Sequence, residues 1–238
     1  MIEVSELSKS YGSVVAVDRL SFTVAAGEVL GLVGPNGAGK TTTLRSLCGI
    51  INPTSGSIRI AGHDLRKEGP KAKAELAFVP DEPQLFDYLT VEEHLKFVGR
   101  LYGVADTPAR APVLLEELEL TEKQRALPGE LSRGMKQKLA IACGLLHRPR
   151  VLMLDEPLTG LDPAGIKKMR ATITARAKEG AAVILSSHLL HLVEELCTRL
   201  LVIRRGKCVA LGTIEQIVAE RPELKGQDLE QIFLTLTA

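Results

Sequence analysis

Short apolar stretches separated by turn residues dominate the first quarter of the chain. Residues 14–24 and 28–33 are rich in β-branched and apolar side chains, and residues 57–60 alternate polar with apolar positions. These patterns predict strands, and an Ala-Gly pair supplies a turn between the first two. The region 2–60 is therefore expected to consist mainly of strands joined by turns.

Helical patterns begin within this region and dominate the middle of the chain. Residues 41–49 predict a helix, and residues 90–102 carry apolar side chains at 91, 95, 98 and 101, on one helical face. Thr90 can cap this second helix, and Glu93 completes a capping box. Three more helices are expected at 112–120, 132–147 and 163–178.

Strand signals return in the second half of the chain. Residues 151–154 and 183–186 are short apolar runs suited to a buried parallel sheet. Two further apolar runs flank Arg205 and Gly206, a pair that predicts a hairpin. The remainder, from Thr213 onward, is predicted to be helical.

These elements predict a single α/β domain over residues 1–238. Its core takes residues of about 1–83 and 150–212, and a helical subdomain of about 84–149 is inserted into that core. A helical tail follows at about 213–238. The expected architecture is a doubly wound sheet with an inserted subdomain.

Composition narrows the range of functions. Hydrophobic residues make up 45% and charged residues 25% of the chain, as in soluble globular proteins. A net charge of +1, 3% aromatic residues and no Trp argue against a nucleic-acid partner. No apolar run approaches the roughly 18 residues of a membrane span, and the N-terminus lacks the features of a secretion signal. We therefore expect a cytosolic protein.

The cysteines and most histidines suggest no chemistry of their own. The cysteines lie in apolar stretches without a CxxC pair, and we expect buried side chains in a reducing compartment. They are Cys48, Cys143, Cys197 and Cys208. Three histidines belong to no cluster and are expected to be structural: His63, His94 and His147.

The strongest chemical signal is the segment GPNGAGKT, which matches the pattern GxxxxGK[ST] in full. Glycines let successive backbone N–H groups turn toward a phosphate, and the following helix N-terminus adds a positive dipole end. Lys40 is expected to bridge the β- and γ-phosphates, and the Thr41 hydroxyl to bind Mg²⁺. The loop comprises Gly34, Pro35, Asn36, Gly37, Ala38, Gly39, Lys40 and Thr41.

A second signal is the acidic pair that ends the apolar run at 151–154. Asp155 and Glu156 would emerge at the carboxyl edge of the sheet, where ligands of open α/β sheets bind. Asp155 can hold Mg²⁺, and Glu156 can polarise an attacking water as a general base. Alone the pair is weak evidence, but with a complete phosphate loop upstream it predicts nucleotide hydrolysis.

The ordered motifs resemble the nucleotide-binding subunits of ATP-binding cassette (ABC) transporters over nearly the whole chain. They are Tyr11, the phosphate loop, VPDEP, the LSRGM signature that starts at Leu131, Asp155-Glu156-Pro157, Gly160-Leu161-Asp162 and His188. The segments LTVEEHLKFVGRLYG, SRGMKQKL and DLEQIFLTLT look most like the prokaryotic ABC-2 subgroup, which typically drives export. The resemblance implies a P-loop NTPase (RecA-like) core, an N-terminal antiparallel β subdomain and an inserted helical subdomain.

The resemblance also assigns residues to the binding of ATP and Mg²⁺. Tyr11 would stack on adenine, Val17 and Thr42 would complete the nucleotide site, and His188 would contact the γ-phosphate while it holds Glu156 and water in place. The metal would take Thr41, Asp155 and Asp81 as ligands. These roles are what the family likeness implies.

Further roles implied by the resemblance concern a second subunit. Ser132 and Gly134 would cap the γ-phosphate bound to that subunit, which implies a head-to-tail dimer with two ATP molecules at the interface. Asp162 would communicate across it. The second subunit is another copy or a paralogous ATPase subunit. Separate membrane permease subunits would be driven from the inner face of the cell membrane, where this chain would be peripheral.

Three positions depart from the family pattern. Asp81 stands where Gln is common, and Arg133 and Met135 replace Gly and Gln in the signature. Gly134 is kept, and we expect it to need a positive φ. Arg133 either contacts phosphate or the partner, or faces solvent.

Other interpretations are weaker. His188, His191 and Glu195 recur at helical spacing and could bind a metal, although no other ligand cluster supports this. A soluble ABC ATPase that acts on nucleic acid or ribosomes usually has two cassettes, coiled coils or zinc motifs, which are not seen here. A regulator that hydrolyses little ATP would leave the catalytic positions without a role. A P-loop kinase would leave the signature and His188 without a role.

Overall fold

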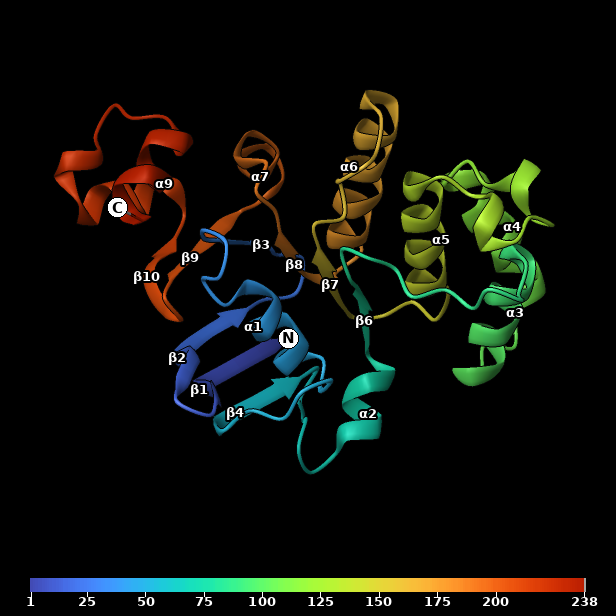
Figure 1. Ribbon diagram of the computed structural model, residues 1–238, viewed down its shortest axis with the longest axis horizontal. Coiled ribbons are helices and arrows are strands. Elements are labelled where there is room, and N and C mark those ends of the chain that lie inside the picture. Colours follow the sequence, from blue (N-terminus) through green and yellow to red (C-terminus); the bar gives the residue numbers. More distant parts are fainter. Residues whose placement is uncertain (238) are drawn as a thin grey trace.

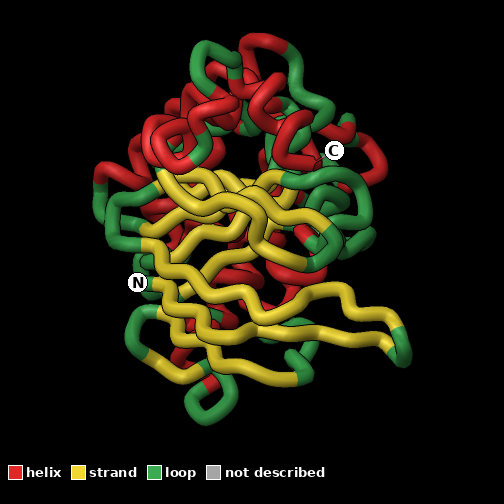
Figure 2. The backbone as a smooth tube through the Cα atoms, turned by 90° about the vertical axis from the view of Figure 1, so that its left-hand side faces the viewer, coloured by secondary structure: helices red, strands yellow, loops and turns green. Residues whose placement is uncertain are grey.

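The computed structural model describes residues 1–237, and two stacked β-sheets form its centre (Figure 2). The smaller sheet is antiparallel, in the order β2-β1-β4-β5. Its strands are β1 (Ile2–Tyr11), β2 (Val14–Val24), β4 (Ser55–Ile60) and β5 (His63–Asp64). The N-terminal antiparallel subdomain expected from the sequence is therefore present.

The larger sheet has the order β10-β9-β3-β8-β7-β6. All neighbouring pairs are parallel except β9 and β10, which form the predicted hairpin. Arg205 (φ 48°) and Gly206 (φ 79°) make its turn, as in a type I′ connection. The strands are β3 (Val29–Val33), β6 (Leu76–Val79), β7 (Val151–Asp155), β8 (Ala182–Ser186), β9 (Arg199–Arg204) and β10 (Lys207–Gly212).

Helix α1 (Lys40–Leu47) lies between the two sheets (Figure 1). Its Leu44 and Leu47 are fully buried, in one core with Ile2 of the smaller sheet and Ile184 of the larger one. Because both faces of α1 are covered, this packing fixes the loop that precedes the helix against the sheet edge.

Three helices between β6 and β7 gather on one side of the molecule (Figure 1): α3 (Val91–Leu101), α4 (Thr107–Glu117) and α5 (Arg133–Leu146). The expected capping box of Thr90 and Glu93 is present at α3. Helix α4 begins at Thr107, not at residue 112, so Pro112 lies inside it. Pro108 occupies the first turn, where proline fits, and the packing of Leu114 and Leu115 in the core outweighs the cost of Pro112.

The remaining helices pack around the two sheets. They are α2 (Gly69–Ala74), α6 (Pro163–Lys178), α7 (Leu190–Leu196), α8 (Ile214–Glu220) and α9 (Leu229–Thr237). Short 3₁₀ turns occur at Thr121–Lys123, Pro128–Glu130 and Pro222–Leu224. Across residues 1–237, no helix combines the length and the apolar character that crossing a bilayer requires.

The cysteines are all free, but they differ in burial. Cys48 is buried, and burial raises the pKa of Cys143 and of Cys197 to about 12, so both thiols stay protonated. The expectation of a buried side chain is wrong for Cys208, which is exposed. This residue lies on β10, the edge strand, and the apolar run around it indicates a strand but not which face is covered.

Candidate nucleotide-hydrolysis site

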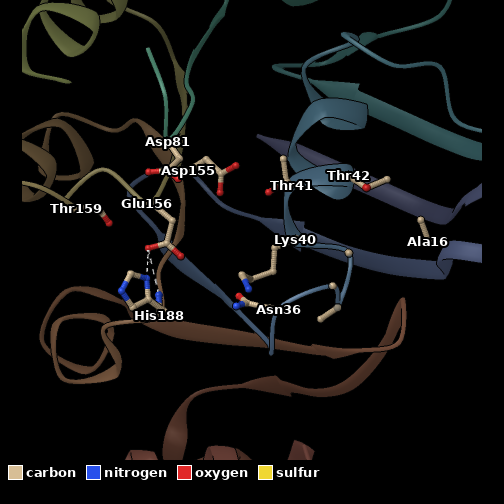
Figure 3. Close-up of a pocket in the computed structure, with 13 residues that line it drawn as sticks. Ala16, Asn36, Lys40, Thr41, Thr42, Asp81, Asp155, Glu156, Thr159 and His188 are labelled. Carbon is tan, nitrogen blue, oxygen red and sulfur yellow. Dashed lines mark hydrogen bonds and ion pairs between the residues drawn. The ribbon is translucent and has the colours of Figure 1, made fainter. Parts of the chain in front are cut away.

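A cleft of about 380 Å³ opens at the carboxyl edge of the larger sheet. The segments that follow β3, β6, β7 and β8 all reach it, as expected for a ligand site of an open parallel sheet. It is lined by Ala16, Asn36, Gly37, Ala38, Gly39, Lys40, Thr41, Thr42, Asp81, Asp155, Glu156, Thr159 and His188. In Figure 3 the carboxylates and His188 stand on one side, and Thr41, Thr42 and Ala16 on the other, with Lys40 between them.

The loop before α1 has the shape that phosphate binding requires. Gly39 has φ 107°, and a Cβ there would lie 2.4 Å from the carbonyl oxygen of Ala16, so no other residue fits. Lys40 Nζ donates to the carbonyl oxygens of Gly34 at 2.7 Å and Pro35 at 3.3 Å. The ammonium group is thus held over the loop, beside the helix N-terminus.

Lys40 is shaped electrostatically by its surroundings. Burial lowers its pKa, while the carboxylates of Glu156 and Asp155 oppose that shift. A partly desolvated cation beside a helix N-terminus is a suitable partner for a polyphosphate. The negative phosphate oxygens can stabilise the ammonium group in place of the water molecules that burial has removed.

The sheet itself positions Asp155. The residue ends β7, is only 4% exposed, and lies opposite Ser186 of the neighbouring strand β8. The Ser186 hydroxyl donates a hydrogen bond to Asp155 Oδ1. Sequence reasoning did not find Ser186, although its position at the end of a predicted buried parallel strand is the signal that could have done so.

Glu156 is held by the chain on two sides. It adopts φ 50°, which is uncommon for a residue other than glycine, and its N–H donates to the Ser186 carbonyl oxygen at 3.0 Å. His188 donates to Glu156 Oε2 from its backbone N–H at 3.3 Å and from Nδ1 at 2.9 Å (Figure 3). The Glu156 side chain is 15% exposed, so it lies in the cleft wall with one end directed by His188.

Two lining residues were not expected from the sequence. Ala16 lies on the cleft wall, whereas Val17 is fully buried and its Cγ2 lies 3.5 Å from the Cβ position of Gly39. The hydroxyl of Thr159 is buried and has no hydrogen-bond partner within residues 1–237. Tyr11, by contrast, is half exposed outside the lining, with Lys9 Nζ 4.9 Å from its ring centroid.

The signature residues are also outside the cleft lining of their own chain. Ser132 caps α5 and accepts a hydrogen bond from the Met135 N–H at 3.2 Å. Asp162 caps α6 in the same way, with the Gly165 N–H at 2.9 Å. Both side chains therefore fix helix starts.

The expectation that Gly134 needs a positive φ is wrong. Gly134 lies within α5, and the reason for a glycine there is space. A Cβ would lie 2.8 Å from the carbonyl oxygen of Gly160, in the loop after β7. The start of α5 is thereby packed directly on that loop.

A metal site at His188, His191 and Glu195 is not supported. Within the part of the chain that the structure describes, no group of three or more His, Cys, Asp or Glu side chains can hold a metal ion. Glu195 instead pairs with Arg170. The other histidines make structural contacts; for example, His94 is buried and accepts from the Phe86 N–H at 3.0 Å.

Comparison with known proteins agrees with this site. The model of the ABC transporter family matches residues 17–159. The chain is 41% identical to the Nod factor export ATP-binding protein I of Paraburkholderia xenovorans. The alignment covers 98% of this chain and 76% of that protein. It is 32% identical to the ABC-type transporter ATP-binding protein EcsA of Bacillus subtilis, over all of this chain and 96% of that one.

A solved structure gives the same result in three dimensions. The ATP-binding subunit of an ABC transporter superposes with a TM-score of 0.95 at 33% identity, over the full length of both chains. The match covers the phosphate loop, the acidic strand end and the helical subdomain. The cleft, its phosphate loop and these matches lead to one conclusion: the chain belongs to the ATP-binding subunits of the ABC transporter family.

Proposed function

We propose that this chain hydrolyses ATP in the cleft and that hydrolysis drives a membrane partner in export. The observation that carries the proposal is the position of the Glu156 carboxylate, which His188 Nδ1 contacts at 2.9 Å. Glu156 lines the same cleft as the phosphate loop, where Lys40 is partly desolvated. A carboxylate fixed beside a polyphosphate site can orient and deprotonate water. Names of relatives such as the Nod factor export protein support the export direction.

In the proposed mechanism each residue has one task. Loop N–H groups and Lys40 bind the phosphates, and Lys40 compensates charge that develops on them. Glu156 accepts the proton of the attacking water, while His188 keeps the Glu156 carboxylate in place. Tyr11 lies outside the lining, but its ring is half exposed and would stack on adenine.

The donor set fits Mg²⁺. Thr41, Asp155 and Asp81 line the same cleft and offer only oxygen atoms. Mg²⁺ typically takes one or two carboxylates together with phosphates of the substrate, and therefore needs no complete cage of side chains. When bound, the ion would neutralise phosphate charge and help to orient the nucleotide.

We further propose a head-to-tail dimer. The cleft of one chain is lined by the phosphate loop, Glu156 and His188, whereas Ser132 at the start of α5 lies outside it. The Ser132 hydroxyl accepts one bond from the backbone, and its proton remains available to a ligand. A second copy would bring this helix start to the open side of the cleft, with Asp162 beside it.

The membrane partner is expected to dock near the segment between β6 and α3. Phe86, Tyr88 and Phe97 are 54%, 93% and 42% exposed, and Phe86 and Phe97 pack edge to face with ring centroids 5.1 Å apart. Aromatic residues exposed together on a charged surface are typical of a protein interface. The chain would then be cytoplasmic and peripheral on the inner face of the membrane.

The test is a pull-down from gently solubilised membranes with tagged Glu156→Gln protein and Mg-ATP. Because this variant should bind ATP without hydrolysing it, a dimer that is held together by ATP should persist. Recovery of a polytopic membrane protein, reduced in a Tyr88→Ser variant, is expected. Exclusive recovery of ribosomes or nucleic acid would favour the soluble alternative, against which the net charge of +1 already argues.

A further inference from the structure

Two residues that depart from the family pattern contact each other. Arg133 Nη2, at the first residue of α5, lies 2.9 Å from Asp81 Oδ1 in the segment after β6. The sequence predicted that Arg133 would contact phosphate or the second subunit, or would face solvent. It did not predict an ion pair within the same chain. At two distant positions the sequence thus has charged residues, one acidic and one basic, where the family commonly has uncharged ones. The fold brings these two residues together.

The path of the Arg133 side chain is set by packing. Its Cγ and Cδ atoms lie 3.4 and 3.1 Å from the position that a Cβ on Gly160 would take. The aliphatic stem therefore crosses the loop after β7 before the guanidinium reaches Asp81. One helical turn along α5, Gln137 Nε2 lies 3.5 Å from the Pro80 carbonyl oxygen, which adds a second link to the Asp81 segment.

Charge gives this pair a function. The cleft lining includes three carboxylates, those of Asp81, Asp155 and Glu156, and ATP brings further negative charge. A glutamine at residue 81, as is common in the family, would add no charge. An unpaired Asp81 would repel a polyphosphate, whereas the Arg133 guanidinium compensates that charge without entering the cleft lining.

We propose that Arg133 is a positioning residue that makes Asp81 compatible with bound nucleotide. It pairs with Asp81 Oδ1, which compensates the charge of that carboxylate and leaves Oδ2 for the proposed Mg²⁺ contact. It also ties the start of α5 to the nucleotide cleft of the same chain. Since Ser132 precedes Arg133, the ion pair connects the cleft with the surface that would face a second copy. This inference rests on the nucleotide site of the proposed function.

The experiment is a double-mutant cycle of Arg133→Met and Asp81→Gln. Methionine keeps an unbranched stem over Gly160 and removes the charge. The measured quantity is the equilibrium affinity for a non-hydrolysable ATP analogue with Mg²⁺, so that turnover plays no part. We expect Arg133→Met to weaken affinity roughly three- to tenfold at low salt, because the Asp81 carboxylate then repels the nucleotide. The loss should be smaller at high salt, because ions screen that repulsion.

In the Asp81→Gln background the same change should alter affinity by less than about twofold, because the charge that needed a partner is gone. Equal losses in both backgrounds, or no loss in either, would overturn the proposal. Arg133→Lys retains the charge and should keep most of the affinity. Arg148→Met is the matched control, since Arg148 is 74% exposed beyond the other end of α5 and pairs with Asp106.

The outcomes separate this inference from the proposed function. Wild-type protein that binds no nucleotide would contradict the nucleotide site itself. Wild-type binding with additive variants would contradict only the pair. Thermal melting of each variant establishes that it is folded before its affinity is compared, and Arg133→Gln, which also removes the charge, supplies the comparison if Arg133→Met unfolds.

Discussion

The hydroxyl of Ser186, at the end of β8, donates a hydrogen bond to the carboxylate of Asp155, at the end of the neighbouring strand β7. Both residues are buried, and they lie opposite each other in the parallel ladder. The sheet register therefore fixes the position of this carboxylate in the cleft lining. A buried carboxylate without such a partner is costly, so the bond contributes to stability as well as to the site.

Ser186→Ala should lower the free energy of unfolding by about 1–3 kcal/mol, because it removes a hydrogen bond from a buried carboxylate. Urea denaturation measures this change, and titration with Mg-ATP should show weaker binding. Ser187→Ala is the control for affinity: Ser187 is also buried, but its hydroxyl accepts from the Leu189 N–H at 3.1 Å. Equal effects of the two variants on nucleotide affinity would show that the Asp155 contact is not special.

His188→Ala should reduce kcat by about a hundredfold, since the variant lacks the ring that positions the Glu156 carboxylate. KM should change little if His188 acts mainly through Glu156. Steady-state phosphate release measures both constants. His191→Ala, on the exposed side of α7, should retain wild-type kinetics. A His188→Ala enzyme with unchanged kcat would contradict the positioning role.

Gly134→Ala should destabilise the packing of α5 on the loop after β7. The added methyl group would lie 2.8 Å from the Gly160 carbonyl oxygen, which is backbone and cannot rotate away. Overpacking of this kind costs about 1–3 kcal/mol, and ATP turnover should fall with it. Gly129→Ala is the control because its Cβ meets nothing within 4 Å. Chemical denaturation of both variants decides whether space, not conformation, requires Gly134.

His147 gives a pH dependence of stability with a definite sign. Burial lowers its pKa below the usual 6.5, and its Nε2 lies 3.2 Å from the Leu76 carbonyl oxygen. The unfolded chain therefore binds a proton more readily, so this contribution to stability is complete above pH 6.5 and is lost as the pH falls below it. Denaturation at several pH values should show a steeper loss in wild type than in His147→Gln. Parallel curves would contradict the prediction.

Local patterns predicted much of the fold and part of the site. The phosphate loop is contiguous, and its glycines, Lys40 and Thr41 act through local geometry that eight residues specify. The capping box at Thr90 and the turn at Arg205-Gly206 are equally local, and both are present. Asp155 and Glu156 follow directly from the end of an apolar strand.

Relationships between strands and between loops could not be predicted in this way. The pairing of Ser186 with Asp155 depends on which strands are neighbours, and the pairing of Arg133 with Asp81 depends on how α5 packs. Sequence rules also failed where tertiary packing outweighs them. Helix α4 includes Pro112 because its apolar face is buried, and the need for a glycine at 134 comes from a loop far along the chain.

The proposed function depends above all on Glu156, which we infer activates water for ATP hydrolysis. The most direct measurement is phosphate release from Mg-ATP by the purified wild-type protein and by Glu156→Gln, together with the affinity of each for ATP. We expect turnover by the wild type, a loss of at least about a hundredfold in Glu156→Gln, and retained ATP binding in that variant. Turnover that survives the substitution would contradict this role of Glu156.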